Sequence, residues 1–519
     1  MTKPDLKKEN NEKLMKVRKW LFFLIVLFAG LISLCILICC ISKPQDNLIP
    51  RHMMITVPIA SIMGILLFWI WSEIISDKLE RINDWIFGTG ISLYGMALFL
   101  ISIFAQNNPS LHDYNIMLDA AGDIAKNREI ATGWYYEIIR HNFKPAMYLG
   151  YLTKVSDKIG LNLYYAGCFI SILVLIGAIL AVRYLAGKDK TERKKYQIPV
   201  LLMFIMLLPI VCYTSFFYTD TLSFGLGIIG IALFKFAYNV KTKAKILLFV
   251  LSGLLFGFAY TLKVTCLIPL IAAVAVYVFF CKKNAIPCVC ICVVAALIIV
   301  EGTTLMANKY EPYQKSKERA VPVIHYIALG LCGDGSIEAN KEYGEEMMTM
   351  PTSENITDLA VNYMKDNKEN FWSIYHYIEK TRCNFGTGTF KAVHAMYYEK
   401  EGYENNIIHK MFHPYGEYYW RTSQICFTYL FSFWTIIAIG SIVSVIDVIK
   451  KKTMDVTLIW SDLAIIGIFV FLMLWEACSR QMYNQMPGMI LCVIMNLRKI
   501  CEMGFFHKEK RKENGTTGN

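Results

Sequence analysis

The chain has 519 residues, of which 55% are hydrophobic and only 18% are charged, and its formal net charge is +12. Soluble domains carry about 25% charged residues, and they lack uncharged apolar blocks as long as those over 20–41 and 201–217. This distribution excludes a soluble enzyme, a secreted disulfide scaffold and a disordered chain.

The apolar blocks predict an all-α polytopic membrane fold. A bilayer core about 30 Å thick requires about 20 apolar residues per helix. About twelve segments meet that requirement, in chain order 20–41, 54–72, 86–105, 163–182, 198–217, 222–238, 246–262, 264–280, 285–305, 425–446, 457–475 and 486–500.

Basic residues concentrate on one side of these segments. If the N-terminus is cytoplasmic, the basic parts of the chain that fall on the inner side are 1–19, 183–195, 241–245, 282–283, 450–452 and the C-terminal group that runs from Arg498 into the tail 501–519. Lys and Arg are enriched in cytoplasmic loops. The positive net charge therefore predicts the orientation of a plasma-membrane protein with both termini inside, and not nucleic-acid binding.

Two predicted outer loops are far longer than ordinary connections of about 4–6 residues. The first, 106–162, lies within the transmembrane module 20–305, and the second, 306–424, forms an extracytoplasmic domain before the C-terminal helices 425–500. Long ordered loops typically carry function. We therefore expect the active site on the extracytoplasmic side.

The first outer loop contains an acidic residue at the start of a helical pattern. After Asp113, apolar residues recur at helical spacing over 116–125, which predicts an amphipathic helix along the membrane surface. Asp113 is either the N-cap of that helix or a catalytic carboxylate held at the membrane–water boundary.

Very short outer connections also carry charged residues. Asp220 lies between two spans with no room for a hydrophilic loop, Lys263 lies in the next tight turn, and Glu476 and Arg480 lie in the last one. A charge near lipid depth is costly and marks a candidate functional site, although a helix cap would explain Asp220 and snorkelling would explain Lys263. Cations in such turns suit an anionic ligand such as a lipid phosphate.

The second outer loop holds two more candidate cations. A predicted helix over 358–382 ends with Lys380 and Arg382, which either bind a lipid phosphate or act as favourable charges at a helix C-terminus. The glycines of the segment VIHYIALGLCGDGS lack the strand and the lysine of a nucleotide-binding loop. The histidines are scattered without zinc spacing, so no metal site is predicted.

Several of these segments resemble the GT-C class of integral-membrane glycosyltransferases, in particular the bacterial family-39-like, protein-mannosyltransferase-like members. The likeness extends over residues 85–500 and is carried by HDYNIMLDAAGDIA, RHNFKPAMYLGYL, FYTDTLS, EKTRCNFGTGTF and WEACSRQMY. It implies a GT-C-like architecture and the transfer of a sugar from a polyprenyl-phosphate donor to an acceptor on the outer face. The acceptor would be a cell-wall polymer, a glycolipid or a protein.

The resemblance also implies roles for individual residues. Asp113 would be the catalytic base, and Asp220 would orient the acceptor or share a divalent metal ion, since some relatives use a metal. Substrate would be bound by His112, His141, Asn142, Lys263, Lys380, Arg382, Glu476 and Arg480.

Two other functions are compatible with the charge pattern. A transporter or flippase for a lipid-linked or anionic substrate would also use buried charges, but inverted repeats and charges at the bilayer midplane are more typical of it. A non-catalytic assembly or receptor protein would tolerate Asn at both Asp113 and Asp220.

Overall fold

The computed structural model describes residues 3–42, 59, 61, 84–105, 112–187, 189–240, 243–280, 285–392, 406–450 and 454–502. Within these ranges every regular element is a helix, which confirms the all-α prediction. The predicted span 54–72 lies almost entirely outside the described residues.

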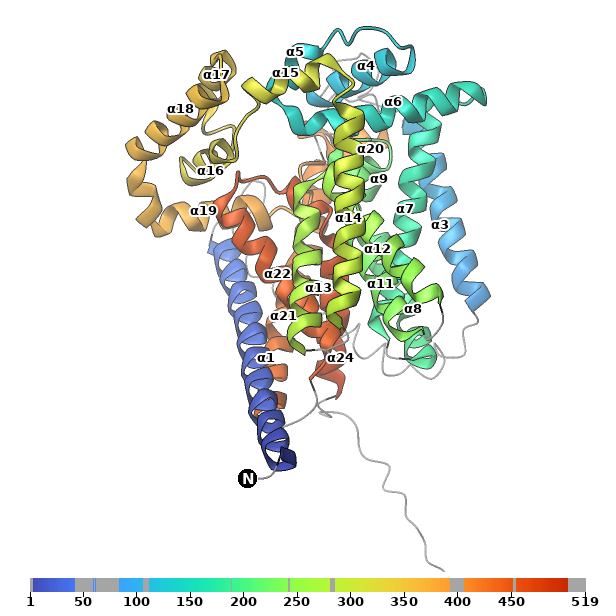
Figure 1. Ribbon diagram of the computed structural model, residues 1–519, viewed down its shortest axis with the longest axis vertical. Helices are drawn as coiled ribbons and strands as arrows, with labels where there is room; N and C mark the ends of the chain where they lie inside the picture. The colour runs from blue at the N-terminus through green and yellow to red at the C-terminus, as the bar shows by residue number, and fades with distance from the viewer. Residues whose placement is uncertain are drawn as a thin grey trace, which may run out of the picture.

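Eight helical segments of the described ranges are long and apolar enough to cross a membrane. They belong to α1 (Lys3–Ser42), α3 (Asp84–Ala105), α7 (Leu163–Ala186), α10 with α11 (Thr219–Leu222 and Leu226–Asn239), α12 (Ala244–Leu262), α14 (Ala285–Ala307), α21 (Tyr419–Ile449) and α22 (Val456–Leu474). Shorter helices α13 (Leu267–Phe280) and α24 (Met486–Glu502) pack among them (Figure 1).

The predicted span 198–217 is not one continuous helix. Its first part belongs to α8 (Lys190–Met206), and a single turn, α9 (Ile210–Tyr213), follows. Pro209 lies between them; proline lacks a backbone N–H and disfavours helical backbone in the residue before it. The chain therefore leaves the helix and runs irregularly toward Asp220.

Close packing between two spans depends on small residues. A Cβ atom at Gly253 of α12 would lie 2.2 Å from the carbonyl oxygen of Cys292 in α14, and one at Gly257 would lie 2.4 Å from that of Ala296. Two glycines four residues apart let helix backbones approach closely, and this arrangement replaces the hydrophobic driving force that is missing in lipid.

The helix bundle has two different ends, and we call the end remote from the N-terminus the distal end (Figure 1). The helices that gather there are α4 (His112–Ala125), α5 (Gly133–Ile138), α6 (Phe143–Lys158), α15 (Glu311–Arg319), α16 (Val323–Leu331), α17 (Lys341–Thr349), α18 (Ser353–Asp366), α19 (Ile374–Phe385) and α20 (Ile407–Phe412). The two long loops of the sequence thus lie together on one end.

Ion pairs join helices at the opposite end, and Arg498 is the most buried of their members. Arg498 of α24 donates to the carbonyl oxygen of Ala186 at 3.0 Å and pairs with Asp455 and, at 3.6 Å, with Glu192. Arg183 of α7 pairs with Asp84 of α3. Some residues of the predicted basic clusters therefore have structural partners as well as a place in the topology.

The amphipathic helix predicted after Asp113 is α4, but its apolar face is covered by protein. Met117, Ala120 and Ala121 are fully buried, and Ile124 packs so closely on α6 that a Cβ at Gly150 would lie 2.7 Å from its side chain. The helix therefore contacts α6 through the residues that were predicted to face the membrane surface.

The predicted helix 358–382 is two helices, α18 and α19, joined by a short 3-10 turn, η3 (Lys368–Trp372). Asn367 ends α18 and donates from its side chain to the carbonyl oxygen of Tyr363 at 2.9 Å. Ser373 then caps α19 by accepting from the backbone N–H of His376 at 3.3 Å. Both residue types favour such caps over helix interiors.

Candidate functional site

Asp220 is the centre of the candidate site at the distal end. It lies in the single turn α10 and its side chain is completely buried. Gly225 follows in the left-handed conformation with φ of 71°, and a Cβ there would also lie 2.5 Å from the Cβ of Ala178. This glycine allows the chain to turn sharply from α10 into the membrane helix α11.

Two cations pair with this one carboxylate. Lys263, at the junction of α12 and η2 (Val264–Cys266), pairs with Oδ1 of Asp220, and Nε of Arg480 lies 3.2 Å from Oδ2. The three charges come from three separate turns and sum to +1. Because 13% of the Lys263 side chain and 21% of the Arg480 side chain remain exposed, both cations are partly accessible, and Glu476 is a further carboxylate that acts electrostatically on both of them.

Tyr218 connects this ion cluster to Asp113. The Arg480 guanidinium lies over the Tyr218 ring, 4.7 Å from its centroid, and the Tyr218 hydroxyl donates to Oδ2 of Asp113 at 3.1 Å. Asp113 lies in the first turn of α4. Both acidic candidates of the sequence thus belong to one continuous set of contacts.

Asn142, in the 3-10 turn η1 (Arg140–Asn142) that follows α5, supports the same arrangement. Its side-chain amide is buried and donates to the hydroxyls of Tyr135 at 2.7 Å and Tyr218 at 3.2 Å. Burial raises the pKa of Tyr135, so this phenol stays protonated at neutral pH. The buried Oδ1 of Asn142 has no hydrogen-bond partner in the structure.

Aromatic residues form one wall beside these groups. Tyr326 of α16 stacks on Trp475 with ring centroids 4.9 Å apart, and its hydroxyl lies 3.4 Å from Nδ1 of His141. Glu476 follows Trp475 and is half-buried; burial raises its pKa, and the nearby Arg480 and Lys391 oppose that rise. His141 and Glu476 therefore lie at the margin of the cluster.

Lys380 does not reach the Asp220 cluster. It is fully buried and donates to the carbonyl oxygen of Gly330, and burial lowers its pKa to about 7. A Cβ at Gly330 would lie 2.4 Å from the carbonyl oxygen of Trp475. Lys380 thus holds the glycine-rich turn against the segment that carries Glu476 and Arg480.

Arg382 lies on another side of α19. It pairs with Glu379 at 2.6 Å and acts electrostatically on Cys40 of α1. Helical spacing separates it from Lys380, so the two cations do not share a ligand site. The side chain of His112 lies outside the described residues.

The described residues contain no group of three or more His, Cys, Asp or Glu side chains that could hold a metal ion. The only predicted basis for a metal was Asp220, and its carboxylate is engaged by Lys263 and Arg480 instead. Cys332 and Cys383 are both buried and are not joined by a disulfide bond.

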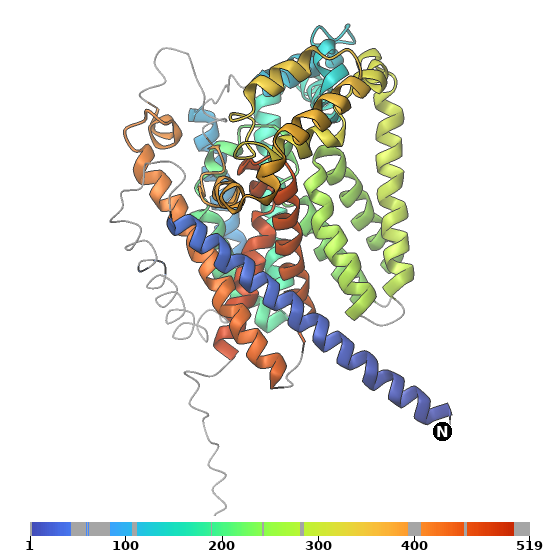
Figure 2. The same cartoon turned by 90° about the vertical axis from the view of Figure 1, so that its left-hand side faces the viewer.

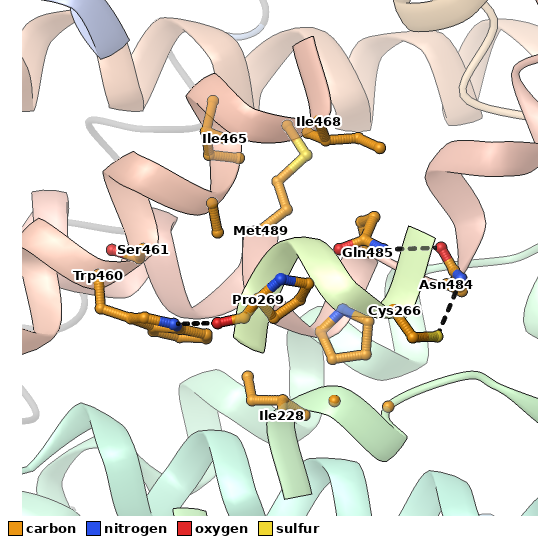
Figure 3. A pocket seen from close by; sticks show the side chains of 15 residues that line it. Ile228, Cys266, Pro269, Trp460, Ser461, Ile465, Ile468, Asn484, Gln485 and Met489 are labelled. Atoms are coloured by element: carbon orange, nitrogen blue, oxygen red, sulfur yellow. Dashed lines mark hydrogen bonds between the residues drawn. The ribbon is translucent and has the colours of Figure 1, made fainter. Parts of the chain in front are cut away.

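An apolar pocket is lined by residues that lie close along the chain to the three charged residues, and Figure 3 shows its lining side chains. Asp220, Lys263 and Arg480 are each followed within five residues by a residue of its lining, namely Gly225, Cys266 and Asn484. The unfilled space between its lining residues is about 470 Å³ when the part open to solvent is included, but only about 20 Å³ of it is wide enough for the centre of a water molecule.

The pocket has an apolar body and one polar end. The apolar side chains that line it and are labelled in Figure 3 include Ile228, Pro269, Ile465, Ile468 and Met489. At the polar end, the side-chain amide of Asn484 donates to the Thr265 hydroxyl at 2.9 Å and that of Gln485 donates to the Thr265 carbonyl oxygen at 3.1 Å. Along the segment that starts at Arg480, the cation is followed by the amides of Asn484 and Gln485 and then by the apolar side chain of Met489.

Sequence reasoning missed several residues of this site. Tyr218 adjoins Asp220 in the quoted FYTDTLS segment, but a tyrosine among membrane aromatics gives no separate signal. Tyr326 and Asn484 show their importance only through contacts between distant segments.

Comparison with known proteins places the chain in a family. No curated protein and no solved structure matches it. Residues 8–500 match the family described as conserved hypothetical integral membrane protein. That match covers nearly the whole chain, and it agrees with the eight apolar helices that are long enough to cross a bilayer. The chain therefore belongs to this family of integral membrane proteins.

Proposed function

We propose that this protein is a membrane glycosyltransferase that transfers a sugar from a polyprenyl-phosphate donor to an acceptor at the outer face of the plasma membrane. The observation that carries the proposal is the partly accessible Lys263 and Arg480 pair, anchored on buried Asp220 and close along the chain to residues that line an apolar pocket. An anionic lipid is complementary to this arrangement, because its phosphate can pair with the two cations and its hydrocarbon chain can contact the apolar residues.

The proposed orientation places the distal end outside. The predicted basic clusters precede or follow spans at the opposite end, where enrichment in Lys and Arg indicates the cytoplasm. In this arrangement both termini are cytoplasmic, and about twelve spans in a GT-C-like architecture carry the two outer loops. The resemblance noted above supports the same assignment.

The reaction requires little from the protein beyond charge and position. A bond forms between the acceptor oxygen and the anomeric carbon while the bond from that carbon to the phosphate oxygen breaks. The electron pair leaves with polyprenyl phosphate, where Lys263 and Arg480 stabilise the developing negative charge. The departing phosphate needs no proton, so a general acid is unnecessary.

The acceptor hydroxyl must lose a proton, and Asp113 is the better placed of the two carboxylates to receive it. Both carboxylate oxygens of Asp220 are paired with cations, so neither is directed toward an acceptor hydroxyl. Asp113 accepts a hydrogen bond from the neutral hydroxyl of Tyr218 and lies in the predicted first outer loop. We therefore assign Asp113 as base and Asp220 as the anchor of the two cations.

Turnover of lipid-linked sugars tests this proposal. The purified protein in lipid nanodiscs would receive a panel of polyprenyl-phosphate sugars labelled in the sugar, and sugar release would be measured. Asp113→Asn should abolish release, whereas the matched control Asp119→Asn, an exposed carboxylate on the same helix, should leave it unchanged. Full release by Asp113→Asn would refute the base, and no release by the parent with any donor would refute the enzyme.

A further inference from the structure

Three large apolar side chains are exposed where the turn η3 meets the start of α19. Trp372 is 89% exposed, Ile374 is 78% exposed and Tyr375 is 66% exposed. We call residues 372–375 the aromatic tip. A cluster of large apolar side chains on a protein surface is typical of a site that contacts another molecule or a membrane.

The tip is held rigidly in this exposed position. The opposite face of α19 is buried: Nδ1 of His376 bonds the carbonyl oxygen of Gly333 at 2.8 Å, and Asn384 donates to that of Leu472 in α22 at 3.2 Å. Ser373 caps the helix within the tip itself. The exposure of the tip is therefore a consequence of how α19 is anchored.

The tip lies at the level where a membrane span ends. The C-terminal end of α19, remote from the tip, lies beside the end of α1: a Cβ at Gly386 would lie 3.3 Å from Sγ of Cys40, close to Ile41, where the apolar span of α1 ends. Figures 1 and 2 both show α19 beside the distal end of α1, and Figure 1 shows it lower than the distal ends of α7 and α14. Figure 1 shows α19 running across the view at about the level of the distal end of α1, and the tip lies at the N-terminal end of this helix.

Charged residues precede the tip along the chain. Lys365, Asp366, Lys368 and Glu369 are all exposed and immediately precede it along the chain. The order from charged residues to Trp, Ile and Tyr matches the membrane interface, where Trp and Tyr rings prefer the headgroup level.

We propose that the aromatic tip inserts into the interfacial region of the lipid bilayer at the distal end and fixes the second outer loop to the membrane. The partner is the lipid surface itself. This anchoring does not depend on glycosyl transfer, so it stands or falls separately from the proposed function.

Fluorescence quenching in nanodiscs tests the anchoring. The parent and Trp372→Phe would be compared with brominated phosphatidylcholine, which quenches tryptophans in contact with lipid, and with acrylamide, which quenches those in water. The substitution should remove a bromolipid-quenched component of about one of the ten tryptophans. The matched control Trp134→Phe, at 54% exposure on α5, should remove acrylamide-quenched signal instead.

Two outcomes would overturn the proposal. If Trp372→Phe removes only acrylamide-quenched signal, the tip lies in water and is free for a protein partner. A second measurement needs no substitution: a photoactivatable lipid in the same nanodiscs should label the peptide with residues 372–375. A peptide that remains unlabelled while lipid-facing residues of α1 are labelled would equally contradict insertion.

Discussion

Replacing Asp220 with Asn should destabilise the folded protein, because it leaves two cations facing each other without a counter-ion. At the 3.2 Å separation of Arg480 and Asp220, two unit charges attract by about 5 kcal/mol at an effective dielectric constant of about 20. Breaking a buried pair costs about 3–5 kcal/mol. Since both cations are partly exposed and recover some hydration, we expect the lower value, about 3 kcal/mol.

The effects on stability of substituting Asp220 and Lys263 should not be additive, and the sign of the difference is predicted. Lys263→Met alone should cost less than Asp220→Asn, because Arg480 still neutralises the carboxylate. The double variant should be more stable than the sum of the two single effects implies, by at least about 1 kcal/mol, because it lacks the uncompensated pair of cations.

Thermal unfolding in detergent can measure these differences with a thiol-reactive fluorophore, since most cysteines of the described residues are buried and react only on unfolding. Asp366→Asn, which replaces an exposed carboxylate, is the control and should unfold like the parent. An Asp220→Asn variant with the unfolding temperature of the parent, or a strictly additive double variant, would refute the ion cluster.

Three further predictions concern groups around the cluster. Tyr218→Phe keeps the ring under the guanidinium but removes the hydrogen bond to the proposed base, so sugar release should fall about tenfold without loss of stability; unchanged release would argue against this contact. The buried lysine Lys380 has a pKa lowered to about 7 from 10.5, so between these values the unfolded state binds more protons and stability rises with pH. The free energy of unfolding should increase by about 2 kcal/mol from pH 7 to pH 9, and Lys380→Met, measured by denaturant titration, should lose that increase. Gly330→Ala should cost about 1–3 kcal/mol because its Cβ would lie 2.4 Å from the backbone of Trp475, whereas Gly344→Ala in an open helical position should be neutral or slightly stabilising in the same unfolding assay.

Hydropathy predicted most of the described spans because a run of apolar residues has one stable solution in lipid, a helix. It failed at 198–217, where composition is apolar throughout but Pro209 breaks the helix between Met206 and Ile210. The spacing of apolar residues also predicted one helix where there are two, α18 and α19, because the capping residues Asn367 and Ser373 are weak signals within a helical pattern. Backbone chemistry, and not hydrophobicity, decides both cases.

The candidate site was partly predictable, because charged residues in tight turns between spans are rare. That criterion found Asp220, Lys263 and Arg480, but no sequence pattern shows that their three turns converge. The same reasoning grouped Lys380 and Arg382 as phosphate ligands, whereas the rotation of α19 directs them to Gly330 and Glu379. The sequence indicated which residues carry charge near the ends of helices, while the direction of a side chain depends on tertiary packing.

Binding of the carrier lipid tests the central claim most directly. Native mass spectrometry of the protein released from nanodiscs would measure saturable binding of polyprenyl phosphate to the parent, to Arg480→Gln and to Arg421→Gln, which replaces an exposed cation at the distal end of α21. We predict that Arg480→Gln weakens binding at least about tenfold while Arg421→Gln binds like the parent. Equal affinity of the parent and both variants would contradict a lipid-phosphate site at the Asp220 cluster.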